Sequence, residues 1–396
     1  SSVTPRQLPA VLAIDGGNSK TDVALVAADG AVLASARGAG VPGMLAGHET
    51  MRVLGSAALA AARQAGLADD GHGLAGHRVA RHVSACVANA DLPEEEQQLA
   101  GALRAQGWGE TVHVANDTFA VLRAGLDDAG VAGGQNWGVA VTCGAGINCV
   151  GVAPDGRTWR FLALGELTGD WGGGDVLAAA AIWWAMRAED GRGPRTSLRD
   201  AVAAHFGMAT MHDVAVGLHT GRIPPAARSG LVPVLFGAAG NGDAVARDIV
   251  GRLAGEVCLM VTTTIRRLGL GRHAVPVVLG GGVLAARDPL LTGQITQRLA
   301  AEVPHARPRI ADIPPIAGAA LLGLDHLGAT PDAKQRLRSA FAAAQDRSGG
   351  GTAPGHPASA GRAGRGRGSG RGDPGRTGER RDDQPPPPSG GLTWLR

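Results

Sequence analysis

The 396-residue sequence has few cysteines, few aromatic residues and few lysines. Four cysteines in so long a chain are too few for a disulfide framework, and no two of them form a CxxC pair of the kind that binds zinc. Aromatic residues make up 3% of the chain, and only two of its 38 basic side chains are lysines. This composition indicates a coding bias toward alanine, glycine and arginine, so the 63 glycines alone predict little about function.

The sequence also lacks a long apolar segment. No stretch reaches about 18 uncharged apolar residues, and the chain does not begin with a basic segment followed by an apolar run. We therefore expect neither a membrane span nor export, and the predicted location is the cytoplasm. With 44% hydrophobic and 18% charged residues, the composition is typical of a folded protein of two domains.

The formal net charge of +3 is distributed unevenly along the chain. The last 50 residues carry +5 and are rich in glycine, arginine and proline, whereas the first 346 residues carry −2. An acidic body excludes the basic surface of a typical nucleic-acid-binding protein. We predict a disordered tail at residues 347–396, which could bind RNA but is more simply interpreted as a solvated extension.

The chain begins the same arrangement of strands twice. Residues 8–14 and 23–27 predict a β-hairpin with a polar tip at residues 15–22, followed by a third strand at 31–36. The pattern then recurs in three further apolar runs, at residues 137–143, 148–152 and 159–164. This repetition predicts a duplicated domain.

Helical and strand-like segments alternate between and after these runs. The helices are predicted at residues 49–65, 94–106, 175–188, 197–206, 243–268 and 315–327, and the strands at 79–87, 111–115 and 275–279. The sequence therefore predicts an α/β protein with an N-terminal domain at residues 1–128 and a second, more helical domain at residues 129–346.

The first hairpin tip has the composition of a phosphate-binding loop. Its residues are Asp15, Gly16, Gly17, Asn18, Ser19, Lys20 and Thr21. Glycines allow backbone N–H groups to approach an anion closely, and the hydroxyls and the lysine add hydrogen bonds and a positive charge. Asp15, at the end of a strand, could hold Mg²⁺ directly or through water. Taken alone, these residues also fit a tight polar hairpin.

Two further glycine turns follow predicted strands. Thr142, Gly144 and Gly146 occupy the matching place in the second hairpin, and two such loops facing one another could clamp a triphosphate. Gly280, Gly281 and Gly282 follow the strand at 275–279 and would let a base and sugar lie against bare backbone. Each turn alone is equally compatible with a flexible connection.

The order of these segments is more informative than any one of them. The motifs are AIDGGNSKTDVALV, VANADLPEEE, HVANDTFAVLRAG, VAVTCGAGINCVGV, LGELTGD, VVLGGGV and PPIAGAALLG, within residues 10–328. Together they resemble the actin, sugar-kinase and Hsp70 ATPase (ASKHA) superfamily, and within it the BadF/BadG/BcrA/BcrD-type ATPases that include N-acetylglucosamine kinases. The resemblance implies a two-lobed, ribonuclease H-like fold built from duplicated βββαβα-type domains, with ATP and Mg²⁺ in the cleft.

The resemblance also implies roles for four polar residues. Asp117 matches the carboxylate that receives the proton of the sugar hydroxyl, and Asn116, Asp91 and Asp170 match sugar-side positions. Asn116 and Asp117 also fit a helix N-cap, and aspartates beside glycines are common turn formers. The chain departs from the family at residues 38–47, which contain no asparagine, and at Trp171-Gly172-Gly173-Gly174, where the family has Glu-Gly-Ser.

The favoured interpretation is a kinase that phosphorylates an amino sugar, with N-acetylglucosamine and its 6-hydroxyl implied by the resemblance. We also expect a homodimer. Two alternatives remain open. One is an ATPase that activates a CoA-linked dehydratase through an iron–sulfur cluster, although Cys143 and Cys149 match no cluster pattern. The other is a sensor that binds a sugar or nucleotide without turnover.

Overall fold

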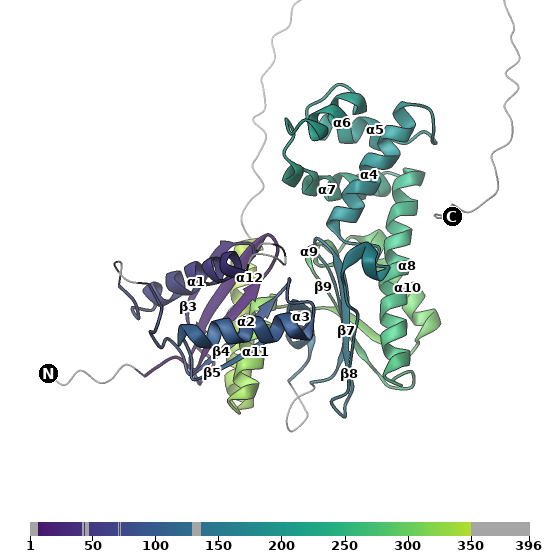
Figure 1. Ribbon diagram of the computed structural model, residues 1–396. Coiled ribbons are helices and arrows are strands. Elements are labelled where there is room, and N and C mark those ends of the chain that lie inside the picture. The colour runs from purple at the N-terminus through teal and green to yellow at the C-terminus, as the bar shows by residue number, and fades with distance from the viewer. Residues whose placement is uncertain are drawn as a thin grey trace, which may run out of the picture. The chain divides into compact units, whose positions relative to one another are not determined.

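Two five-stranded mixed sheets form the framework of the computed structural model, which describes residues 7–41, 43, 47–69, 71, 73–128 and 136–349 (Figure 1). The first sheet has the order β3 (Val32–Ala39), β2 (Lys20–Val26), β1 (Val11–Gly16), β4 (His82–Val87) and β5 (Thr111–Asn116). The second has the corresponding order β8 (Thr158–Arg160), β7 (Ile147–Val152), β6 (Gly138–Cys143), β9 (Pro276–Gly280) and β10 (Arg307–Ile310).

The two sheets share one topology. In each, the first three strands along the chain pair antiparallel, and the two later strands add in parallel on the other side of the first strand. The predicted duplication is therefore confirmed. The parallel strand β10 was not predicted, and β8 is shorter than the predicted strand at 159–164.

Helices cover both faces of the first sheet. Side chains alternate along β1, so that Leu12 and Ile14 pack against α1 (Gly47–Gln64) and α2 (Pro93–Gln106). Val11 and Ala13 face the opposite way, toward α3 (Asp117–Gly125) and α11 (Pro315–His326). This second face is the one that turns toward the second sheet.

Helix α3 connects the two sheets. Its Val121 and Leu122, with Leu126 just after it, pack against apolar side chains of the second sheet, while Ala120 and Ala124 join the core beneath the first. Helix α11 crosses α3 at close range, because a Cβ atom at Gly318 would lie 1.9 Å from the carbonyl oxygen of Ala120. Residues at the start of α3 are thus held in place by contacts from both halves of the molecule.

The second half is the more helical one, as predicted. Between β8 and β9 the chain forms α4 (Gly174–Glu189), α5 (Leu198–His205), α6 (Met211–His219), α7 (Leu231–Gly240) and α8 (Ala244–Arg267), with short 3₁₀ turns η1 (Gly165–Thr168) and η2 (Pro225–Gly230). The short helix α9 (Gly282–Ala285) and α10 (Pro289–Glu302) follow β9. Of these, α6 and α7 were not among the predicted elements, whereas α9 and α10 lie in the segment after the third glycine turn, whose sequence is compatible with helix.

A further helix that was not predicted, α12 (Pro331–Gly349), packs on the first half through Leu337 and Phe341. It includes the first three residues of the predicted tail, and the remainder of that segment lies outside the described residues. The predicted domain boundary at residues 128 and 129 remains a prediction. No helix of the described chain is both long and apolar enough to cross a membrane.

Candidate active site

A cleft of about 1330 Å³ brings the three predicted glycine loops together. Among its lining residues are eleven of the predicted site residues: Asp15, Gly17, Asn18, Ser19, Lys20, Asp117, Thr142, Gly144, Gly280, Gly281 and Gly282. Six predicted site residues do not line it, namely Gly16, Thr21, Asp91, Asn116, Gly146 and Asp170. The three loops therefore lie at one cleft, their ligand-binding roles remain predictions, and strand geometry explains two of the six exceptions.

The first hairpin tip is tighter than predicted. Strand β1 continues through Gly16 and β2 begins at Lys20, so only residues 17–19 form the turn. Asp15 pairs with Asp22 across the hairpin and faces the cleft side of the sheet. The next pair, Gly16 and Thr21, must point the other way, toward α1.

Packing on that other side explains why Gly16 and Thr21 do not line the cleft. A Cβ atom at Gly16 would lie 3.3 Å from side-chain carbons of both Val41 and Val87, and Thr21 is fully buried. The Thr21 hydroxyl has no hydrogen-bond partner among the described residues. These two positions therefore shape the back of the loop rather than its phosphate-facing surface.

Asp15 and Asp117 are half-buried carboxyl groups that line the same cleft. Burial raises the pKa of Asp15 to about 7, and the charges of Asp117 and Asp22 add to this while Lys20 opposes it. Burial also raises the pKa of Asp117 to about 6, against hydrogen bonding from the Thr118 backbone N–H. Negative charge is thus crowded at the carboxyl end of β1.

Asp91 belongs to the same electrostatic group, although it does not line the cleft. Its pKa is raised to about 7 by burial first, then by the charges of Asp117 and Glu95. A hydrogen bond from the Asn116 side chain and the charge of Arg160 act in the opposite direction. A sugar contact by Asp91 remains a prediction.

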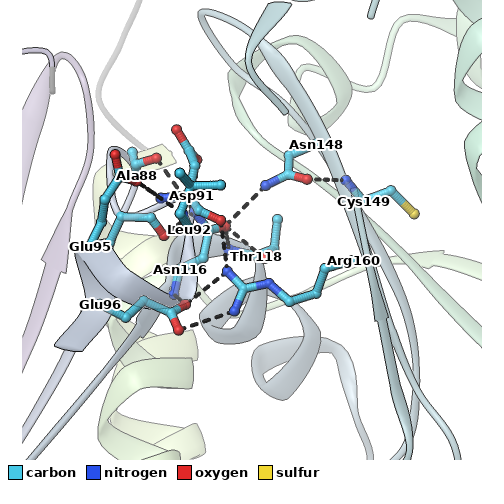
Figure 2. A network of polar contacts seen from close by, with 11 residues as sticks. Ala88, Asp91, Leu92, Glu95, Glu96, Asn116, Thr118, Asn148, Cys149 and Arg160 are labelled. Atoms are coloured by element: carbon cyan, nitrogen blue, oxygen red, sulfur yellow. Dashed lines mark hydrogen bonds and ion pairs between the residues drawn. The ribbon is translucent and has the colours of Figure 1, made fainter. Parts of the chain in front are cut away.

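Asn116, not Asp117, is the N-cap of α3 (Figure 2). Its Oδ1 accepts hydrogen bonds from the N–H and the hydroxyl of Thr118, at 3.1 and 2.7 Å. Its Nδ2 donates to the Ala90 carbonyl and to Asp91 Oδ1, both at 3.1 Å. The buried amide is therefore occupied in holding the loop before α2, and its predicted contact with a sugar remains untested.

The second glycine loop is bound to the start of α4. Gly144 donates its N–H to the Gly146 carbonyl at 3.0 Å and accepts from the Gly174 N–H at 2.7 Å. Gly173 has a φ of +92°, and a Cβ atom there would lie 2.3 Å from the Ala145 carbonyl oxygen. The unusual glycines after Trp171 thus let the α4 terminus approach the loop, a role that their departure from the family pattern could have signalled.

The third loop lies directly against the end of β6. Gly281 has a φ of +80°, and a Cβ atom there would lie 2.6 Å from the carbonyl group of Cys143. At Gly280 a Cβ atom would lie 2.4 Å from Val121 of α3. Both positions require glycine for close approach, so this loop is more than a flexible connection.

Asp170 lies away from the cleft lining, in the link between η1 and α4. Its Oδ2 accepts a hydrogen bond from the Thr168 hydroxyl at 2.7 Å, and its N–H donates to the Gly165 carbonyl at 3.1 Å. Its charge also helps to raise the pKa of Glu256, after the larger effect of burial. The predicted sugar contact of Asp170 is untested.

Sequence reasoning missed a second wall of the cleft, formed by η2, α7 and the segment after α9. It contributes Arg228, Val232, Phe236 and Arg287 to the lining. Phe236 and Val232 are apolar, whereas the two arginines could interact with anionic groups. Arg228, Val232 and Phe236 recur at every fourth residue across η2 and α7, whereas Arg287 comes from a distant segment, so no local motif marks the four together.

The lining fits a single Mg²⁺ ion held mainly by phosphate oxygens and water. No group of three His, Cys, Asp or Glu side chains within the described residues could hold a metal by itself. Asp15 instead offers one carboxylate whose ionisation is opposed by neighbouring negative charges. A divalent cation would offset those charges, and Mg²⁺ commonly binds one or two carboxylates beside a polyphosphate.

Comparison with known proteins identifies a matching family and similar proteins. A family model described as the BadF/BadG/BcrA/BcrD ATPase family matches residues 12–323. An N-acetylmuramic acid/N-acetylglucosamine kinase of Clostridium acetobutylicum is 26% identical over 277 residues, which cover 69% of this chain and 85% of that protein. An N-acetyl-D-glucosamine kinase of Dictyostelium discoideum is 25% identical over 221 residues, 55% of this chain and 67% of that one.

Solved structures confirm the predicted two-lobed ASKHA fold. A protein of Chromobacterium violaceum provisionally named N-acetylglucosamine kinase has a TM-score of 0.60 at 23% identity, covering 80% of this chain and 99% of that one. A Porphyromonas gingivalis protein with the same provisional name has a TM-score of 0.56 at 18% identity, with 80% and 99% coverage.

Proposed function

The chain belongs to the BadF/BadG/BcrA/BcrD ATPase family, and from this membership we propose that it is an ATP- and Mg²⁺-dependent kinase of an amino sugar. N-acetylglucosamine is the first candidate substrate and its 6-hydroxyl the candidate acceptor. The observation that carries the proposal is the position of Asp117, a carboxylate that lines one cleft together with glycine loops from both sheets. Two relatives named as kinases of N-acetylated sugars support the substrate class.

In this proposal the loops bind and orient the nucleotide. Lys20, Ser19 and the turn backbone would hold phosphate oxygens from one side, and Thr142 and Gly144 from the other. The glycines of the third loop would support the ribose and base. Bound Mg²⁺, held through Asp15, would neutralise phosphate charge.

Asp117 would act as the general base. Its pKa of about 6 leaves it ionised at neutral pH, yet makes it a stronger base than an ordinary aspartate. It would accept the proton of the sugar hydroxyl as that oxygen forms a bond to the γ-phosphorus and the bond to the ADP oxygen breaks. Asn116 caps α3, so the Asp117 carboxylate is not needed for that structural task.

The burial of the cysteines argues against the iron–sulfur alternative. All four cysteines are buried, and burial raises the pKa of Cys143 and Cys149 to about 12. Both lie in the apolar core of the second half. A cluster shared between subunits needs accessible thiolates, and these side chains could provide them only after unfolding of that core.

The direct test is ADP release by the purified protein with Mg·ATP and a panel of sugars: N-acetylglucosamine, N-acetylmuramic acid, N-acetylgalactosamine, glucosamine and glucose. We expect release that depends on an N-acetylated sugar, from a colourless protein without iron. Nucleotide binding without release on any sugar would instead favour the sensor. Iron bound in proportion to protein would favour the dehydratase activator.

A further inference from the structure

Arg160, the last residue of β8 in the second sheet, makes its polar contacts with the first half of the chain (Figure 2). Its Nη1 donates to Glu96 Oε2 at 3.0 Å, and its Nη2 lies 2.9 Å from Glu96 Oε1. Nη2 also donates to the Asp91 carbonyl at 3.0 Å. The guanidinium further lies 5.3 Å from the centre of the Phe119 ring.

These three partners surround the start of α3. Phe119 lies on α3 itself, two residues after Asp117, and Asp91 belongs to the loop that the Asn116 amide holds. Glu96 Oε1 accepts the backbone N–H of Asn116 at 2.9 Å. One guanidinium thus contacts α3 and the Asp91 loop directly, and reaches the backbone of Asn116, the residue before Asp117, through the Glu96 carboxylate.

A second residue of the same sheet supports this connection. Asn148 of β7 donates from Nδ2 to Asn116 Oδ1 at 3.3 Å, while its own Oδ1 accepts the Cys149 N–H at 2.7 Å. The contact is longer than those of Arg160 and involves no charge. Arg160 is therefore the stronger of the two links.

We propose that Arg160 is a positioning residue, which transmits the position of the second sheet to the Asp91 loop and to the Asp117 end of α3. The inference rests on the proposed function for its catalytic consequence. Side chains of the Arg160 and Glu96 pair are 22% and 15% exposed, so water competes with the pair less than at an open surface. The planar fork of arginine can bind a carboxylate and a carbonyl together, which one lysine ammonium does less well.

The proposal has a consequence that local stability alone does not produce. A shift of about 1 Å at a catalytic group can reduce turnover on the order of 10²-fold. Loss of Arg160 should therefore lower kcat while the affinity for Mg·ATP, which binds through the glycine loops, stays nearly unchanged. Loss of a purely structural ion pair would instead lower the stability of the fold, without a selective fall in kcat at an unchanged KM for Mg·ATP.

The experiment compares Arg160→Gln and Arg160→Lys with a matched control, Arg192→Gln. Arg192 is also ion-paired with a carboxylate, that of Asp190, but its side chain is 61% exposed and, among the described residues, its polar contacts are with Asp190 alone. Two quantities are measured on the full chain. The first is hydrogen–deuterium exchange in peptides covering residues 88–92 and 116–120, and the second is kcat and KM with the best sugar.

For Arg160→Gln we expect faster exchange in both segments and kcat lower by on the order of 10-fold to 100-fold, with the KM for Mg·ATP changed less than about twofold. Arg160→Lys should recover part of both effects, and Arg192→Gln should match the wild type. If Arg160→Gln fails to fold, the lysine variant carries the test with the same direction of change.

Unchanged exchange in the two segments would overturn the positioning role, and so would faster exchange with an unchanged kcat. A wild-type protein that releases no ADP with any sugar would contradict the proposed function instead. In that case the exchange measurement still decides whether Arg160 holds the start of α3, because it does not depend on turnover.

Discussion

Asp15 lies in a place where its own negative charge is unfavourable. Burial and the neighbouring carboxylates raise its pKa to about 7, so near neutral pH the folded protein holds it about half protonated. Functional sites often retain such groups at a cost in stability, because a ligand later compensates for it. For this protein the compensating ligand in our proposal is Mg²⁺ with ATP.

This cost predicts that Asp15→Asn stabilises the ligand-free protein at pH 8. The unfolded carboxyl ionises near pH 3.8 and the folded one near pH 7, so the native state loses stability as pH rises between these values. Asparagine carries no ionisable group, so the variant does not lose stability in this way as the pH rises. We expect a melting temperature higher by on the order of a few degrees at pH 8.

The same substitution should make a much smaller difference at pH 4, where Asp15 is protonated in the folded protein and about half protonated in the unfolded chain. Thermal unfolding of both proteins at the two pH values, without nucleotide or metal, measures the effect. A stabilisation equal at pH 4 and pH 8, or a destabilisation at pH 8, would show that Asp15 is not held in this environment. Activity with Mg·ATP should be lost in the variant, because its metal anchor is gone.

For single residues, the sequence indicated which residue types form the site better than it indicated which way each side chain faces. The DGGNSKT motif indicated a phosphate loop, but Gly16 and Thr21 face α1 because strand β1 continues one residue beyond Asp15. Consecutive residues of a strand face opposite sides of the sheet, so the continuation of β1 through Gly16 turns that position away from the cleft that Asp15 lines. Asn116 shows a similar limit, since its hydrogen bonds with Ala90 and Asp91 depend on a loop 25 residues away in sequence.

At the scale of elements, the third glycine loop provides a matched pair of positions. Gly281→Ala would place a Cβ atom 2.6 Å from the Cys143 carbonyl group at a φ of +80°, whereas a Cβ atom at Gly282 meets no atom within 4 Å. We expect Gly281→Ala to destabilise the fold by at least about 1–2 kcal/mol and to raise the KM for ATP. Gly282→Ala should retain near-wild-type stability.

Urea unfolding and steady-state kinetics of the two variants check this prediction. Equal behaviour of the two alanine variants would mean that the loop relaxes freely, and that the close approach of β9 to β6 does not shape the nucleotide site. The two positions are adjacent in the same loop. Gly282→Ala therefore serves as the control for any general effect of adding a methyl group there.

Elements with strong local patterns could be predicted, and those fixed by distant contacts could not. The apolar periodicity of α8 and the short apolar runs of β1 and β2 on either side of a polar turn were sufficient. Helix α12 has few large apolar residues of its own, and its position depends on long-range contacts. Arg338 donates to the Ala124 carbonyl at 3.0 Å and pairs with Asp128 at 2.6 Å, more than 200 residues away in sequence.

For the whole molecule, the duplicated sheets explain why the three loops meet. In each sheet a glycine loop follows the first strand, β1 or β6, at its carboxyl end. The central helices α3 and α11 lie between the sheets, and the two loops line the same cleft. This arrangement could be predicted from the repeated hairpin. The second wall, with Phe236 and Arg228, could not, because the inserted helices that carry it have no counterpart in the first half.

Two truncations test how far the functional chain extends. Removal of residues 350–396 should leave melting temperature and kinetics nearly unchanged, because the segment is polar and has little to bury. Removal from residue 329 onward should cost on the order of 3 kcal/mol, because the core loses the fully buried Leu337 side chain and Asp128 loses Arg338, one of its two arginine partners. Calorimetry of both truncated proteins measures this difference.

A large loss of stability or activity from the shorter deletion would show that the terminal segment contributes to the folded protein. An unchanged melting temperature after the longer deletion would show that α12 contributes nothing to the stability of α3. Either result would revise the part of the chain that we assign to the catalytic body.

The central claim, that Asp117 is the base of a sugar kinase, is tested most directly by the steady-state kinetics of Asp117→Asn. The substitution preserves shape, and Asn116 continues to cap α3. We predict kcat lower by on the order of 10²-fold or more, with Mg·ATP affinity nearly intact, because a base acts chiefly in the transition state. Near-wild-type phosphorylation of the best sugar by a well-folded Asp117→Asn protein would contradict the claim.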